Sequence, residues 1–182
     1  MHLRQSQTTT RQHKTMPHQI QQHLTMEAII KELGNNLIEH HYSLSSTESF
    51  TVGHFASSIG LVPGISAIYR GSLVSYQTRI KHDVLHVSQD IIDQYGVVSH
   101  EVAYAMCKNG QELFDSDICI SFTGNAGPSA MEGKKVGLVY IGVAFLDDIE
   151  TYELQLDGTR EEIVHQAVRI GAMKILEKIR EK

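Results

Sequence analysis

Ser49 lies between a short segment of strand character and the first residues of a helical pattern, so it is predicted to occupy a strand-to-helix turn. On such a turn a serine hydroxyl is exposed and the following backbone N–H groups point at one spot, as they do in a nucleophile beside an oxyanion hole. A second interpretation is that Ser49 or Thr51 caps the helix, which is the commoner role of these residue types.

A serine nucleophile needs a base, because its hydroxyl is weakly nucleophilic at neutral pH. No histidine stands in an evident partner segment, but Lys81 follows a predicted strand that ends at Tyr76. Burial lowers the pKa of a lysine, so Lys81 could act as the base with Tyr76 assisting. The alternative is an ordinary exposed lysine and a tyrosine whose hydroxyl lies in water.

Two further features suit an anionic ligand. The glycine-rich stretch 123–128 follows a predicted strand, and it offers backbone N–H groups and the hydroxyl of Thr123, although a plain turn has the same composition. Arg160 opens the last predicted helix, where the helix dipole disfavours a cation. A phosphate bound there would explain Arg160; a solvated side chain paired with Glu161 or Asp157 is the alternative.

Other familiar sites are not predicted. The glycines before Lys134 do not have the Walker A spacing, and the sequence contains no G-x-G-x-x-G. His82 and His86 lie four apart on a predicted helix and could share a face, but no third zinc ligand is evident, so two solvated histidines are favoured. Cys107 and Cys119 are too few for a disulfide framework or a four-thiolate site. We therefore expect no metal and no cofactor.

The composition is that of one globular domain with an extension. The chain has 182 residues, of which 41% are hydrophobic and 20% charged, and its formal net charge is −5. Negative charge argues against a nucleic-acid partner, and no apolar stretch approaches the roughly 18 residues of a membrane span. We expect a cytoplasmic protein without a membrane partner. Residues 1–26 have no acidic residue and no apolar periodicity, which predicts a disordered or flexible extension before a folded domain at 27–182.

Strands and helices are interspersed along that domain, a pattern typical of layered α/β proteins, whose ligands gather at the carboxyl ends of strands. Helices are expected from about Glu27 to His40–His41, near 55–59, at 80–85, after the possible N-caps Ser88 and Ser99, and over 159–179, where Thr159 and Glu162 form a T-x-x-E capping box. Strands are expected at 43–48, 68–76, 118–122, 136–145 (a central strand) and 151–156.

Taken in order, seven short motifs resemble the CinA C-terminal domain family, whose stand-alone form is the nicotinamide-mononucleotide amidase. The resemblance runs from about Glu27 to Ile179. The motifs are Glu48–Gly53 (E-S-x-T-G-G in the family), Val62–Ser66 (V-P-G-S-S), Gly71–Tyr76 with Lys81 (G-x-V-x-Y-x-N-x-x-K), Gly96–Ser99 (G-A-V-S), Thr123–Pro128 ([ST]-G-I-A-G-P), Val136–Ile141 (V-G-L-V-Y-I) and Gly158–Arg160 (G-D-R).

The resemblance implies a three-layer α/β/α fold with a central mixed sheet. It also implies an amidase that converts nicotinamide mononucleotide, a small-molecule nucleotide substrate, to nicotinic acid mononucleotide and ammonia without a metal or cofactor. Ser49 would be the nucleophile, with Lys81 and Tyr76 as the other catalytic residues. The implied substrate-binding residues are Thr51, Gly53, Thr123, Gly124, Ala126, Gly127 and Arg160. A homo-oligomer is left open.

The sequence also departs from the family pattern around the expected pocket. Val52 replaces a glycine, Asn125 stands where a branched apolar residue is usual, and Val164 falls where a second arginine is common. Gln77-Thr78 replaces Ser-Asn, the loop 129–133 is one residue shorter, and Lys135 replaces a proline. Two alternatives to the amidase therefore stay open: a ligand-binding or interaction module without turnover, and an amidase for a different amide.

Overall fold

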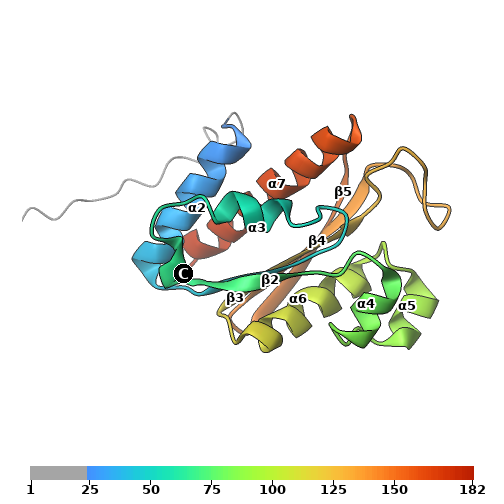
Figure 1. Ribbon diagram of the computed structural model, residues 1–182, viewed down its shortest axis with the longest axis horizontal. Helices are drawn as coiled ribbons and strands as arrows, with labels where there is room; N and C mark the ends of the chain where they lie inside the picture. Colours follow the sequence, from blue (N-terminus) through green and yellow to red (C-terminus); the bar gives the residue numbers. More distant parts are fainter. Residues whose placement is uncertain (1–23) are drawn as a thin grey trace, which may run out of the picture.

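The computed structural model describes residues 24–182, which form one mixed five-stranded sheet between two layers of helices (Figure 1). The strands are β1 (Leu44–Glu48), β2 (Tyr69–Val74), β3 (Ile118–Gly124), β4 (Leu138–Phe145) and β5 (Asp148–Gln155). Their order in the sheet is β2-β1-β3-β4-β5. Strand β1 runs parallel to β2 and β3, whereas β4 is antiparallel to both β3 and β5. The three-layer fold expected from the resemblance is confirmed.

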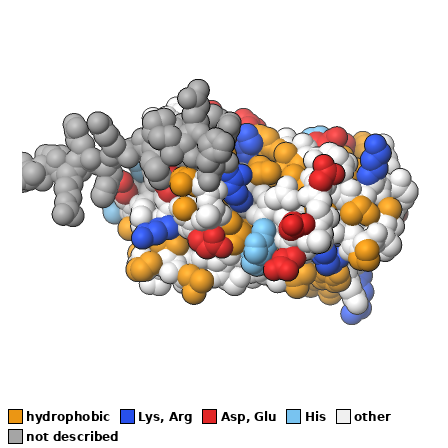
Figure 2. Space-filling model, turned by 90° about the horizontal axis from the view of Figure 1, so that it is seen from above, with side chains coloured by type: hydrophobic (Ala, Val, Ile, Leu, Met, Phe, Trp, Pro, Cys, Tyr) orange, Lys and Arg blue, Asp and Glu red, His pale blue; other side chains and the backbone are white. Residues whose placement is uncertain are grey.

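One helical layer contains α2 (Met26–His40), α3 (His54–Ile59) and α7 (Arg160–Arg180). The other contains α4 (Thr78–Asp83), α5 (Gln89–Tyr95) and α6 (His100–Phe114), and a single 3₁₀ turn, η1 (Ile65–Ala67), precedes β2. Figure 1 shows the two layers on opposite faces of the sheet. Figure 2 looks onto the layer of α2 and α7, where apolar side chains alternate with acidic and basic ones, as expected for amphipathic helices whose apolar stripe faces inward.

Side-chain caps define where three of these helices begin. The hydroxyls of Thr25 and Ser99 accept hydrogen bonds from the backbone N–H groups of Ala28 and Val102, at the N-termini of α2 and α6. Thr159 and Glu162 form the predicted capping box at the start of α7. Ser88 is the residue before α5, as predicted, but its side chain makes no capping hydrogen bond.

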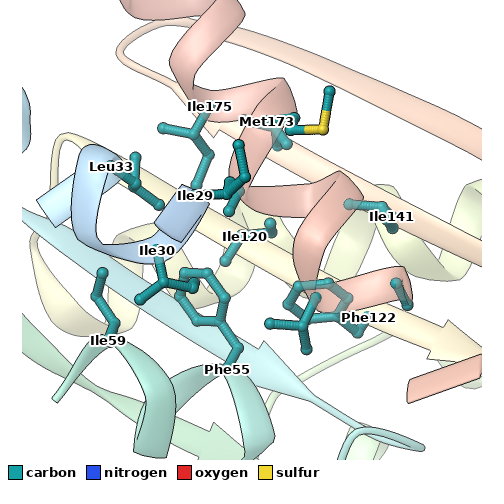
Figure 3. Close-up of a cluster of buried hydrophobic side chains, with 14 of the residues drawn as sticks. Ile29, Ile30, Leu33, Phe55, Ile59, Ile120, Phe122, Ile141, Met173 and Ile175 are labelled. Atoms are coloured by element: carbon teal, nitrogen blue, oxygen red, sulfur yellow. The ribbon is translucent and has the colours of Figure 1, made fainter. Parts of the chain in front are cut away.

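The hydrophobic core lies mainly between the sheet and the layer of α2, α3 and α7. Figure 3 shows side chains from α2, α3, β3, β4 and α7 meeting there; those labelled include Ile29, Leu33, Phe55, Phe122 and Ile175, each fully or almost fully buried. The predicted core face of α7 is buried except for Ile170, which is half-buried against the same cluster. A second cluster lies between the sheet and α5 and α6.

Two details differ from the sequence-based expectations. The strand expected to be central, β4, lies between β3 and β5, and β3 occupies the middle of the sheet. Helix α4 ends at Asp83, and His86 has a left-handed backbone (φ 58°), so His82 and His86 do not share a helix face. The ring Nδ1 of His82 instead lies 2.9 Å from the carbonyl oxygen of Val87.

The parallel strands bring their carboxyl ends to one edge of the sheet. Glu48 pairs with Val74 of β2 on one side and with Phe122 of β3 on the other. The segments that follow these strands are therefore neighbours, although they are far apart in sequence. Of the predicted extension, residues 1–23 lie outside the described part of the chain. Within residues 24–182, none of the helices is both long enough and apolar enough to cross a membrane.

Candidate active site

Ser49 and Lys81 meet directly at this edge of the sheet. Ser49 is only 8% exposed, so the expectation of an exposed serine on this turn is wrong. The Lys81 Nζ donates a hydrogen bond of 2.8 Å to the Ser49 Oγ. It also donates to the carbonyl oxygen of Ser75 at 2.6 Å and lies 3.4 Å from that of Tyr76. These two carbonyls directly follow β2. They orient the Lys81 amine toward Ser49, which directly follows the neighbouring parallel strand β1. Lys81 is therefore not the exposed lysine of the alternative interpretation.

The environment of Lys81 suits a base. The side chain is 1% exposed, and this burial lowers the pKa of its amine to about 8, while the carboxylate of Glu132 opposes the shift. An amine with a pKa near 8 is neutral in an appreciable fraction of molecules near neutral pH. A neutral Lys81 can accept the Ser49 proton, which a lysine with an ordinary pKa rarely can.

Glu48 shapes the turn that carries Ser49. Its fully buried carboxylate accepts hydrogen bonds from the Thr51 hydroxyl (2.6 Å) and from the backbone N–H groups of Phe55 (3.3 Å) and Ala56 (2.9 Å) at the start of α3. A carboxylate at this position accepts hydrogen bonds from helix N–H groups that have no partner within the helix, and the positive end of the helix dipole stabilises its charge. Glu48, rather than Ser49 or Thr51, therefore caps α3, and the Ser49 hydroxyl is left for Lys81.

The turn after Ser49 has two consecutive residues with left-handed backbones, Val52 (φ 48°) and Gly53 (φ 84°). Glycine accepts this conformation freely, whereas a β-branched residue is strained in it. The Val52 side chain is 57% exposed, so the extra atoms project outward. The departure from the family's glycine therefore strains the backbone close to Ser49, and the turn is still formed.

Arg160 and Tyr76 form the other half of the site. One guanidinium nitrogen of Arg160 donates to the Gly127 carbonyl oxygen at 2.6 Å, and the other donates to the Tyr76 hydroxyl at 3.2 Å. The Tyr76 side chain is still 55% exposed. These contacts differ from the expected alternative, in which Arg160 pairs with an acidic neighbour.

The remaining expected ligand residues lie at the same edge in different environments. The hydroxyl of Thr123, 1% exposed, donates to the Val97 carbonyl oxygen at 2.6 Å, so toward a ligand it can act only as an acceptor. Ala126 is buried and Gly124 is half-buried. Thr51 uses its hydroxyl proton to hold Glu48. Sequence reasoning missed that role of Glu48, although a glutamate at a strand end before a helix start was its available signal.

A cavity of about 560 Å³ adjoins the turn. Its walls include Thr51, Val52 and Gly53 on one side, and Arg160 and Val164 of α7 on the other. Two of the departures from the family pattern, at residues 52 and 164, therefore face the same space. Among residues 24–182, no three histidine, cysteine or acidic side chains are grouped so as to hold a metal ion.

Together, the sheet and its edge define a three-layer α/β protein with a serine–lysine pair at the carboxyl ends of parallel strands. The model of the CinA C-terminal domain family matches residues 26–179. A Levilactobacillus brevis protein, provisionally named a competence-damage inducible protein, is 43% identical to this chain over 136 residues. These are 74% of this chain and 33% of that protein. Its counterpart in Halalkalibacterium halodurans is 39% identical over 154 residues, 84% of this chain and 37% of that protein.

Solved structures agree with this assignment. A CinA superfamily protein from Klebsiella pneumoniae superposes with a TM-score of 0.85 at 27% identity, covering 87% of this chain and all of that one. One from Escherichia coli has a TM-score of 0.82 at 26% identity, covering 94% and 98%. The chain belongs to the CinA C-terminal domain family. It spans about a third of the length of the curated relatives it matches.

Proposed function

We propose that the protein is an amidase that hydrolyses the carboxamide of nicotinamide mononucleotide to nicotinic acid mononucleotide and ammonia. The observation that carries the proposal is the 2.8 Å hydrogen bond between the buried Lys81 amine and the Ser49 hydroxyl. A serine beside a base of lowered pKa is one arrangement that supports acyl transfer. The resemblance, which covers the motifs of both residues, supplies the substrate.

In the first half of the proposed reaction, the neutral Lys81 amine takes the Ser49 proton as the Oγ attacks the amide carbon. The resulting ammonium of Lys81 then donates that proton to the amide nitrogen. The C–N bond breaks, ammonia leaves, and the acyl group remains on Ser49 as an ester. Lys81 is neutral again at this point.

In the second half, water attacks the ester carbon and gives a proton to Lys81. The C–O bond to Ser49 breaks, and the Oγ recovers the proton from Lys81, which leaves the carboxylic acid as product. Arg160 would bind the nucleotide phosphate, and Tyr76, which Arg160 contacts, would help to orient the amide. This route uses no metal and no cofactor.

A second candidate is an amidase for a different amide, and the adjoining cavity favours it. Both Val52 and Val164 line that cavity, where the family pattern has a glycine and an arginine. A valine at residue 164 in place of a second cation suits a ligand with less negative charge than a nucleotide. The natural comparison is nicotinamide riboside, which carries the same carboxamide without the phosphate.

The test is ammonia release from nicotinamide mononucleotide and from nicotinamide riboside, with the acid product identified by chromatography. We expect wild type to release ammonia from the mononucleotide with the higher kcat/KM, and Ser49→Ala to lose at least about 10⁴-fold of it. Ser58→Ala is the matched control, because Ser58 also lies on α3 and donates its hydroxyl hydrogen to the His54 carbonyl oxygen, but does not line this cavity.

Three outcomes would contradict the proposal in different ways. A higher kcat/KM for the riboside would favour the second candidate. Binding without ammonia from either compound would favour a ligand-binding module. Activity that survives Ser49→Ala would remove Ser49 from the mechanism.

A further inference from the structure

The loop that joins β3 to β4, residues 125–137, holds two charged side chains more tightly than an exposed loop requires. Residues 128–133 are exposed, yet the side chains of Glu132 and Lys134 are each only 29% exposed. Both side chains turn back onto the short segment 95–98, which links α5 to α6. Long charged side chains lose conformational entropy when they are fixed in this way, so the contacts that hold them must offset that cost.

The contacts are reciprocal. The Glu132 carboxylate accepts from the backbone N–H groups of Val97 (2.8 Å) and Val98 (3.3 Å). The Lys134 amine donates to the carbonyl oxygens of Tyr95 (2.9 Å) and Val98 (2.5 Å), and it lies 3.3 Å from the Glu132 carboxylate. One side chain thus takes the donors of the segment and the other takes its acceptors. We call Glu132 and Lys134 together the clasp.

The segment that receives the clasp is shaped for it. Gly96 has a left-handed backbone (φ 76°), and a Cβ added there would lie 2.4 Å from a Glu132 carboxylate oxygen. A side chain at this position would displace the carboxylate, and the left-handed backbone also favours glycine. The receiving segment and the loop therefore fit each other, although they are about 35 residues apart in sequence.

Asn125 closes the base of the same loop. Its side chain, 1% exposed, donates to the carbonyl oxygens of Met131 (3.3 Å) and Lys134 (3.1 Å), and its backbone pairs with Leu138 and Gly137. An apolar residue could not make the two side-chain bonds. The asparagine and the shortened loop, two separate departures from the family pattern, are thus parts of one arrangement.

The clasped loop is connected to the candidate active site at two points. Its Gly127 carbonyl oxygen accepts from Arg160, whose other nitrogen donates to the Tyr76 hydroxyl. Its Glu132 carboxylate raises the pKa of Lys81 against the effect of burial. The other groups on the Lys81 amine are neutral: the Ser49 hydroxyl and the carbonyls that follow β2.

From these contacts we propose that Glu132 and Lys134 are positioning residues of the amidase. They hold the β3–β4 loop so that the Gly127 carbonyl fixes Arg160 over the site, and substrate affinity depends on the clasp. The proposal rests on the proposed function for its kinetic consequences. The loop geometry itself is independent of that function.

The kinetic test compares Glu132→Gln, Lys134→Met and Lys134→Arg with Lys135→Met. Lys135 is the matched control, because it is the next residue in the same loop and its side chain makes none of these contacts. We expect Glu132→Gln and Lys134→Met each to raise KM for nicotinamide mononucleotide by about tenfold, the effect of losing one or two good hydrogen bonds, with kcat within about threefold of wild type. Lys134→Arg, which keeps the donors, should recover most of the loss, and Lys135→Met should match wild type.

A merely structural role would not shift the pH profile. Removing the Glu132 charge lowers the Lys81 pKa further, so the acid limb of kcat/KM in Glu132→Gln should move to lower pH than in wild type and Lys135→Met. Unchanged KM in both clasp variants, or an unmoved acid limb in Glu132→Gln, would overturn the proposal.

Amide hydrogen exchange separates this proposal from the proposed function. Glu132→Gln should speed exchange at the Val97 and Val98 N–H groups, and Lys135→Met should not, whether or not the protein releases ammonia. A wild type that released no ammonia would end the proposed function and the kinetic part of this proposal. Unchanged exchange in Glu132→Gln would end the clasp.

Discussion

At the scale of single residues, burial of Lys81 costs the folded state stability but lowers the pKa of its amine. A lysine that is 1% exposed loses hydration, and the hydrogen bonds to Ser49 and to the Ser75 carbonyl restore only part of it. Its pKa falls from 10.5 to about 8, which corresponds to roughly 3 kcal/mol of preference for the neutral amine. The same shift that lowers the stability of the fold at neutral pH makes the Lys81 amine able to accept a proton, as the proposed function requires.

Lys81→Met should therefore stabilise the protein at pH 7 by about 1–3 kcal/mol while removing the proposed base. The pKa of Lys81 is lower in the folded than in the unfolded chain, so between pH 8 and 10.5 the unfolded chain binds more protons. As the pH rises through this window, the free energy of unfolding of the wild type should therefore increase relative to that of Lys81→Met, and the difference in stability between the two proteins should become smaller. Urea unfolding of both proteins at pH 7 and pH 9.5 measures it. A variant less stable than wild type at pH 7, or a constant gap, would contradict the assigned environment of Lys81.

At the scale of elements, the unit that matters is β1, the turn 49–53 and α3. The order strand, turn, helix and the position of Ser49 could be predicted, because both depend on local residue types. The capping role of Glu48 depends on a buried carboxylate turning back onto α3, and the clasp depends on side chains that reach a distant segment. Neither leaves a periodic signal in the sequence. The position of β4 in the sheet could not be predicted either, since a buried run has the same composition in the middle of a sheet and next to its edge.

Val52→Gly tests the strain in this turn. Releasing a β-branched residue from φ 48° should stabilise the protein by about 1 kcal/mol, in spite of the greater freedom that glycine gives the unfolded chain. Val84→Gly is the matched control, because Val84 is also an exposed valine, at 43%, but has φ −109° and should lose stability. Thermal unfolding compares the two. Destabilisation of equal size in both variants would show that the turn stores no strain.

At the scale of the whole molecule, the fold brings segments that are distant in sequence to one edge of the sheet. Ser49 follows β1, Lys81 lies in α4 beyond β2, and Arg160 begins the last helix, yet Lys81 donates to the Ser49 hydroxyl and to the Tyr76 carbonyl oxygen, and Arg160 donates to the Tyr76 hydroxyl. The parallel arrangement of β1, β2 and β3 produces this convergence, because it aligns their carboxyl ends. The sequence predicted the residues, and the resemblance predicted their meeting; only the sheet register shows how closely they meet.

The most direct measurement of the central claim is a double-mutant cycle on ammonia release with Ser49→Ala, Lys81→Met and the combined variant. If Ser49 and Lys81 act as one nucleophile and base, each single variant should lose kcat/KM by about 10⁴-fold or more. The kcat/KM of the combined variant should then be no lower than that of the less active single variant. Losses that multiply in the combined variant, or substantial ammonia release after either single change, would contradict a shared catalytic role for these two residues.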